Sequence, residues 1–115
     1  MDEAGFRHGI KLFNAGEFFE AHEVLEDVWR AAPVAEKRFL QGLIQIAVGF
    51  VHYQRGNLVG AKSLCARGSR NLSRYGKQFG GVPITELLTR VAEWRAALDE
   101  QRSLPPFPRI RLTRG

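Results

Sequence analysis

An internal repeat with an offset of 40 residues restricts the fold of this chain more than any other pattern in it. In each copy an aromatic residue, Phe13 or Tyr53, stands three positions before a glycine, Gly16 or Gly56, and an alanine follows five positions after that glycine. Glycine ends a helix readily because it adopts the left-handed conformation at little cost, and the small alanine lets the next helix pack closely. The repeat therefore predicts two similar antiparallel helix hairpins.

Apolar residues recur at helical spacing along the chain, and no β pattern is visible. Pro33 marks the end of the second helix, and Gly56 and Gly76 mark the ends of the third and fourth. We expect an all-α fold, a compact bundle of about five helices, with a loop over residues 80–83. The predicted helices span residues 3–14, 17–31, 35–55, 57–76 and 84–101.

The order of glycine, aromatic residue and alanine resembles the tetratricopeptide hairpin. Two copies are fewer than the three or more of a free-standing array, so we expect a compact bundle rather than an open solenoid. The bundle is predicted to be a single domain over residues 1–103, followed by a tail over residues 104–115 that contains prolines and arginines. Prolines exclude a helix in the tail, whereas Phe107, Ile110 and Leu112 would let it lie extended along the bundle. The sequence leaves open whether the tail is ordered.

The composition is that of a globular protein, with 44% hydrophobic and 25% charged residues. The single cysteine, Cys65, excludes an internal disulfide, which fits the reducing cytoplasm that we expect as its location. The most apolar stretch, residues 39–53, is shorter than the roughly 20 residues that span a bilayer, so no membrane partner is expected.

A set of polar residues stands out on the second and third predicted helices. His22 and Glu26 are four positions apart and share a helix face, which Trp29 continues. The third helix is apolar except for a few polar residues at helical spacing, and buried polar groups need partners. Consecutive helices pack antiparallel, so we expect the two polar sets to meet. The predicted network comprises His22, Glu23, Glu26, Trp29, Gln41, Gln45 and His52.

The spacing of His22, Glu26 and Trp29 resembles the His-x-x-x-Glu-x-x-Trp signature of a bacterial and archaeal domain of unknown function, family 309. The residues from Gln41 to Gln45 and from Gly56 to Ala61 are similar to that family as well. The resemblance covers roughly residues 6–75. It implies an all-helical bundle and no particular activity.

Three interpretations of the polar set remain open. In the first, it is a buried hydrogen-bond network that fixes the packing of the helices. In the second, His22, Glu26 and His52 bind a divalent metal with an open position for water, and Glu20 or Glu23 adds an oxygen ligand. In the third, Glu26 tunes His22 for acid–base catalysis without a metal, although no nucleophile accompanies the pair.

The sequence does not decide whether the chain is an enzyme. Our main hypothesis is a non-enzymatic helical module that contacts a protein partner or forms a homodimer, because helix hairpins commonly present grooves to partners. The alternative is a small metal-dependent, hydrolase-like enzyme whose candidate catalytic residues are His22, Glu26 and His52.

The net charge of +5 is unevenly distributed. Residues 1–60 hold six Lys/Arg and eight Asp/Glu, whereas residues 61–115 hold eleven and four. A basic face is predicted on the fourth helix, and nucleic-acid binding through it is a second alternative. No recognised nucleic-acid motif accompanies this face, so nucleic acid is not the partner that we expect. The basic face comprises Lys62, Arg67, Arg70 and Arg74.

Overall fold

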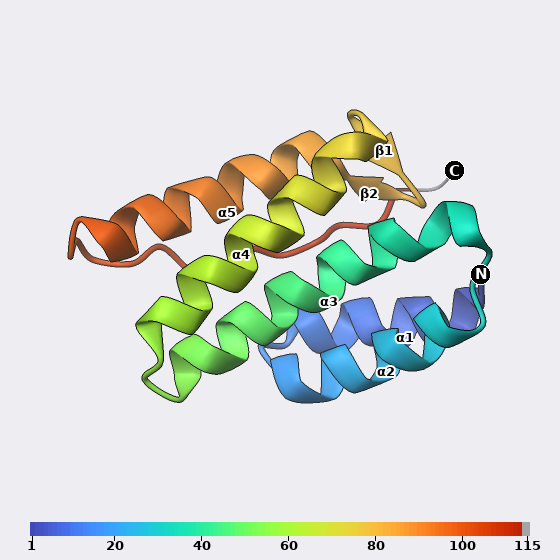
Figure 1. Cartoon of the computed structure of the whole chain (residues 1–115), viewed down its shortest axis with the longest axis horizontal. Helices are drawn as coiled ribbons and strands as arrows, with labels where there is room; N and C mark the ends of the chain where they lie inside the picture. The colour runs from blue at the N-terminus through green and yellow to red at the C-terminus, as the bar shows by residue number, and fades with distance from the viewer. Residues whose placement is uncertain (114–115) are drawn as a thin grey trace.

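Helices form close to the ranges that the apolar spacing predicts (Figure 1). The computed structural model describes residues 1–113, in which five α-helices form one bundle, so the all-α fold class is confirmed. The helices are α1 (Glu3–Asn14), α2 (Phe18–Arg30), α3 (Val34–Gln54), α4 (Leu58–Leu72) and α5 (Ile84–Asp99). Within these described residues no helix combines the length and apolarity that crossing a membrane requires. The cytoplasmic location stays a prediction.

The two repeated corners have the same backbone geometry. Gly16 and Gly56 have φ angles of 79° and 81°, in the left-handed region that favours glycine. At the first corner the Gly16 N–H donates to the Phe13 carbonyl at 3.0 Å, and the Glu17 N–H donates to the Leu12 carbonyl at 3.0 Å. The residues 40 positions later make the same two bonds, at 3.0 and 2.8 Å. The sequence repeat is therefore a structural repeat, in which α1 and α2 form one hairpin and α3 and α4 form the other.

The repeat extends to the contact between the two helices of each hairpin. Gly9 on α1 lies against Leu25 on α2, where an added Cβ would come within 2.7 Å of the leucine side chain. Forty residues later, Gly49 on α3 lies against Cys65 on α4, where an added Cβ would come within 2.9 Å of the sulfur. In both hairpins the missing side chain of a glycine lets the two helices approach closely.

An aromatic cluster joins the hairpins to α5 and to the last described segment. The ring centroids of Phe18 on α2 and Phe50 on α3 are 4.9 Å apart. The Phe50 ring also lies 4.9 Å from Trp94 on α5 and 5.0 Å from Phe107. Phe18, Phe50 and Trp94 are at most 1% exposed. Large buried rings such as these contribute much of the hydrophobic stabilisation of a small domain.

Residues 104–113 run along the bundle without helix or strand, as the red segment in Figure 1 shows. Asn14 holds this segment by two hydrogen bonds: Nδ2 donates to the Ile110 carbonyl at 2.8 Å, and Oδ1 accepts from the Ile110 N–H at 2.7 Å. The Ile110 side chain is buried. The predicted tail extends to residue 115, and its last two residues lie outside the described part of the chain. The division into a domain over residues 1–103 and a tail stays a prediction.

The region after α4 differs from the prediction. The predicted helix over residues 57–76 ends at Leu72, and a 3₁₀ turn (Ser73–Tyr75) follows. Two short strands, β1 (Gln78–Phe79) and β2 (Val82–Pro83), then pair antiparallel, where only a loop was expected. The expectation of no β structure is therefore wrong, because a strand of two residues is too short to show an alternating pattern.

Tyr75, in the 3₁₀ turn, links this region to the start of α3. Its hydroxyl accepts a hydrogen bond from the Phe39 N–H and donates one to the Ala35 carbonyl, each at 3.0 Å. The hydroxyl thus bridges two backbone groups in the first turns of α3. The 3₁₀ turn after α4 carries the tyrosine that makes this bridge.

Candidate functional site

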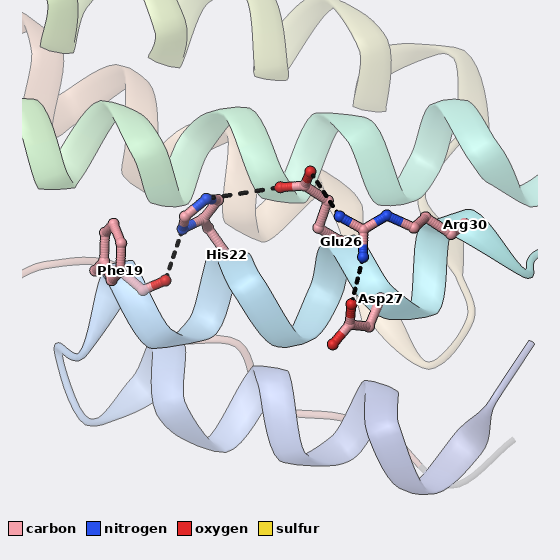
Figure 2. Close-up of polar contacts among 5 residues, drawn as sticks. All are labelled: Phe19, His22, Glu26, Asp27 and Arg30. Atoms are coloured by element: carbon pink, nitrogen blue, oxygen red, sulfur yellow. Dashed lines mark hydrogen bonds and ion pairs between the residues drawn. The ribbon is translucent and has the colours of Figure 1, made fainter.

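His22 lies near the start of α2, and its ring contacts groups of its own helix (Figure 2). Nδ1 is 2.6 Å from the Phe19 carbonyl oxygen. Because a carbonyl oxygen can only accept, Nδ1 carries a hydrogen and donates the hydrogen bond. Nε2 is 3.6 Å from Oε2 of Glu26. This second contact becomes an ion pair at four-residue spacing when both ring nitrogens carry protons. The structure thus places the predicted His22 and Glu26 side by side on α2.

Glu26 continues the polar chain to Arg30 and Asp27 (Figure 2). Arg30 Nη2 is 3.4 Å from Glu26 Oε1, and Arg30 Nη1 is 2.6 Å from Asp27 Oδ1. The side chains of Arg30 and Asp27 are 62% and 75% exposed, and exposed ion pairs contribute about 0–1 kcal/mol each. With Glu23, these side chains line an open hollow of about 310 Å³. The predicted polar set on α2 therefore lies at the surface.

Trp29 does not join this polar chain. Lys37 Nζ lies 4.3 Å from the centroid of the Trp29 ring and donates hydrogen bonds to the carbonyls of Trp29 and Arg30, at 2.6 and 3.2 Å. A lysine bound to the last carbonyls of a helix satisfies acceptors that the helix leaves free. The indole Nε1 is buried and has no hydrogen-bond partner among residues 1–113. Trp29 and Lys37 thus contact each other where α2 connects to α3.

The polar residues of α3 find their partners on the side of α4. Gln45 Oε1 accepts a hydrogen bond from Asn71 of α4 at 2.7 Å. His52 Nδ1 lies 3.1 Å from Nδ2 of Asn57, the residue that precedes α4. Gln41 is exposed. No hydrogen bond or ion pair within residues 1–113 joins these side chains to His22 or Glu26, so the structure brings the predicted network together only within α2.

The three predicted metal ligands are likewise divided between two places. His22 and Glu26 share a face of α2, whereas His52 lies beside the start of α4, where it contacts Asn57 and Gly60. In the described part of the chain no three histidine, cysteine, aspartate or glutamate side chains are grouped so that they could hold one metal ion. The predicted divalent-metal centre therefore has no assembled ligand set in this structure.

The predicted basic face also separates into two parts. Lys62 Nζ lies 2.7 Å from Oδ1 of Asp99 on α5, and the hydrogen bond and charge of Lys62 lower the pKa of that carboxyl. Arg67, Arg70 and Arg74 instead share another hollow, of about 300 Å³, with Gln45 and Asn71. Sequence reasoning missed Asn71, although its position four residues after Arg67 places both side chains on one face of α4.

Comparison with known proteins identifies the family. The family described as "Domain of unknown function (DUF309)" matches residues 6–64, just over half of the chain. The chain belongs to this family. The match runs from α1 to the middle of α4 of this DUF309 protein and includes His22, Glu26 and Trp29. Their spacing as a family signature stays a prediction.

Two relatives of this DUF309 protein are similar over part of their length. An uncharacterized protein, YpuF, from Bacillus subtilis (strain 168) is 44% identical over 64 residues, which cover 55% of this chain and 37% of YpuF. An uncharacterized protein from Aquifex aeolicus (strain VF5) is 27% identical over 82 residues, which cover 70% of this chain and 25% of that relative. This DUF309 chain thus aligns with about a third of one curated relative and a quarter of the other.

Cys65 lies in the core of this DUF309 protein. Its side chain is fully buried between α3 and α4, and burial raises the pKa of the thiol from 9.0 to about 12, although Arg95 lowers it in part. A raised thiol pKa favours the folded state below about pH 9, and this contribution is lost as the pH rises from 9 toward 12.

We therefore expect Cys65 to react with a disulfide reagent at pH 8 about 1,000-fold more slowly in the folded protein than in urea, because the thiolate is the reactive form. The rate of release of the coloured thiolate measures this difference. Equal rates in the two conditions would show that the thiol is accessible in the folded protein.

Exposed apolar side chains lie at both corners of this DUF309 protein, and the polar and charged motifs of the sequence do not indicate them. Phe19 begins α2, and Leu58 and Val59 begin α4. They are 43%, 44% and 80% exposed, respectively. The signal was in the repeat itself, since Phe19 and Val59 are 40 residues apart and each stands three positions after its corner glycine.

Proposed function

We propose that this DUF309 domain is a non-enzymatic module that pairs with a second copy of itself through the corner surface, defined as Phe19, Arg55, Leu58 and Val59. The observation that supports this proposal is the exposure of three large apolar side chains at one end of the bundle. Single exposed apolar residues are ordinary on protein surfaces, whereas a group of them marks a contact site.

Two contacts place the first corner beside the end of α3, which leads into the second corner. Gln54 Nε2 donates a hydrogen bond to the Gly16 carbonyl at 3.3 Å. The Arg55 guanidinium lies 5.6 Å from the centroid of the Phe19 ring, which is cation–π distance. Leu58 and Val59 follow Arg55 by three and four residues. These contacts join the first corner to the end of α3, and we infer that the four residues form one surface built by both copies of the repeat.

Charge supports a second copy as the occupant. Arg55 lies on the corner surface, and Glu17 and Glu20 flank Phe19 at the same end; all three are exposed and form no ion pair within residues 1–113. In a two-fold dimer each contact occurs twice, so a surface that carries both positive and negative charges can pair with the opposite charges of a second copy. Apolar side chains at the centre with charges at the rim are typical of protein interfaces.

The dimer is expected to weaken at least tenfold in Kd when Val59 is replaced by aspartate, because the change buries an unpaired carboxylate in the apolar contact. Sedimentation velocity over a range of protein concentrations measures the equilibrium. Val34→Asp is the matched control, since Val34 is 88% exposed and begins α3 at the opposite end of that helix. It makes the same change of side chain and charge outside the corner surface.

Two outcomes would contradict the proposal. One is a wild-type protein that stays monomeric at the highest concentration reached. The other is an equal loss of dimer in Val34→Asp and Val59→Asp, which would indicate that net charge, rather than the corner surface, controls the association.

A further inference from the structure

The hollow shared by Arg67, Arg70 and Arg74 is lined by hydrogen-bond donors without a balancing carboxylate. Its other lining residues are Gln45 from α3 and Asn71 from α4, and its volume is about 300 Å³. None of the three guanidinium groups forms an ion pair with a carboxylate of residues 1–113. Three cations that share one hollow repel one another, and a bound anion would relieve that repulsion.

The first copy of the repeat has an ion pair at the positions that correspond to two of these arginines. Forty residues before Arg67 and Arg70, the chain carries Asp27 and Arg30, which form an ion pair at 2.6 Å on the face of α2. The second copy has arginine at both positions. At these two places on α4 no carboxylate of the described residues takes the part that Asp27 takes on α2.

The amide pair in the hollow adds a neutral donor. Asn71 Nδ2 donates to Gln45 Oε1 at 2.7 Å, which fixes the Gln45 amide with its oxygen turned to Asn71. The Gln45 Nε2 group donates no hydrogen bond to another described residue. The hollow thus combines three guanidinium groups with a free amide, a set that recognises phosphate oxygens.

We propose that this hollow binds a compact polyphosphate group, that is, a di- or triphosphate chain carrying several negative charges. From Arg67 to Arg74 the chain advances seven residues, or about 10 Å along a helix axis, so the three arginines can reach one small ligand together. An arginine fork binds two phosphate oxygens at once, which favours this ligand over single-charge anions. The three arginines and Asn71 lie beyond residues 6–64, which the DUF309 family matches, whereas Gln45 lies within that range.

Four other basic residues of the second half, Lys62, Arg90, Arg109 and Arg111, do not line this hollow. Lys62 is paired with Asp99, and Arg90 is paired with Glu86. Arg109 and Arg111 line a different hollow, which they share with carboxylates. A nucleic-acid strand needs a continuous row of cations along its backbone, whereas one isolated cluster suits a compact ligand.

Calorimetric titration with inorganic tripolyphosphate at constant ionic strength tests the proposal. Wild-type protein is expected to bind one equivalent, and Arg70→Ala and Arg67→Ala are each expected to weaken binding at least tenfold. Arg7→Ala is the matched control, because Arg7 is exposed on α1, has no ion pair within residues 1–113 and carries the same charge. It is expected to change the affinity less than twofold. Circular dichroism checks that the variants are folded.

Further titrations distinguish the sources of the phosphate chain. Tighter binding of ATP than of tripolyphosphate supports a nucleotide as the ligand, and equal binding supports the phosphate chain alone. The proposal is overturned if wild-type protein does not bind tripolyphosphate, or if Arg7→Ala weakens binding as much as Arg70→Ala. It is also overturned if a single-stranded oligonucleotide binds more tightly than either ligand and Arg109→Ala weakens that binding as much as Arg70→Ala.

Discussion

Replacing Phe50 by alanine is expected to lower the free energy of unfolding by about 3–5 kcal/mol, which is a large share of the stability of a small domain. The Phe50 ring is fully buried and contacts rings from three other segments, namely Phe18, Trp94 and Phe107. Its removal leaves a cavity among side chains that other contacts hold in place, so the neighbouring rings can collapse only in part. Urea denaturation followed by circular dichroism measures the loss.

Phe19→Ala is the matched control for this substitution. Phe19 is 43% exposed and lies on the corner surface, so its truncation is expected to change the stability of the monomer by less than about 1 kcal/mol. The measurement is made at a protein concentration below that at which the wild type associates. Similar losses in the two variants would mean that the aromatic cluster does not hold the bundle together as described.

Gly68→Val is expected to destabilise the protein by about 3 kcal/mol through overpacking. A Cβ at Gly68 would lie 2.6 Å from the Gly42 carbonyl oxygen and 3.1 Å from the Ile46 backbone nitrogen. Both are backbone atoms of α3, so relief requires that the two helices move apart. Thermal unfolding and urea titration measure the effect.

Ser63→Val places the same side chain on the exposed face of α4, and we expect it to change the stability by less than about 0.5 kcal/mol. Wild-type stability in Gly68→Val would contradict the close contact between α3 and α4. A large loss of stability in Ser63→Val would instead indicate that the poor helix propensity of valine causes the effect.

The helices and corners could be predicted because their signals are local. Gly16 and Gly56 adopt the left-handed backbone conformation that ends a helix, which a glycine in the sequence indicates directly. Apolar spacing likewise indicates the buried face of each helix. The repeat also predicted which helices pair, because two copies of one sequence pattern indicate two hairpins of the same geometry. Strands of two residues leave no such pattern, so β1 and β2 were missed.

The partners of the polar residues could not be predicted from spacing. The third helix has neighbours in sequence on both sides, and periodicity shows which residues share a face but not which neighbour covers that face. We expected Gln45 and His52 to meet α2, whereas Gln45 bonds to Asn71 and His52 lies beside Asn57. His22 and Glu26 were placed correctly as neighbours because both lie on one helix, four residues apart.

The two hydrogen bonds between Asn14 and Ile110 join residues that are 96 positions apart, and they bear on the order of events during synthesis. A ribosome releases both hairpins before it adds residues 104–113. Until then Asn14 has no partner, and the rings of Phe18 and Phe50 lack the cover that Phe107 gives them. Until residues 104–113 are added, the nascent chain therefore exposes aromatic surface that is prone to association, and these residues cover that surface once they are synthesised.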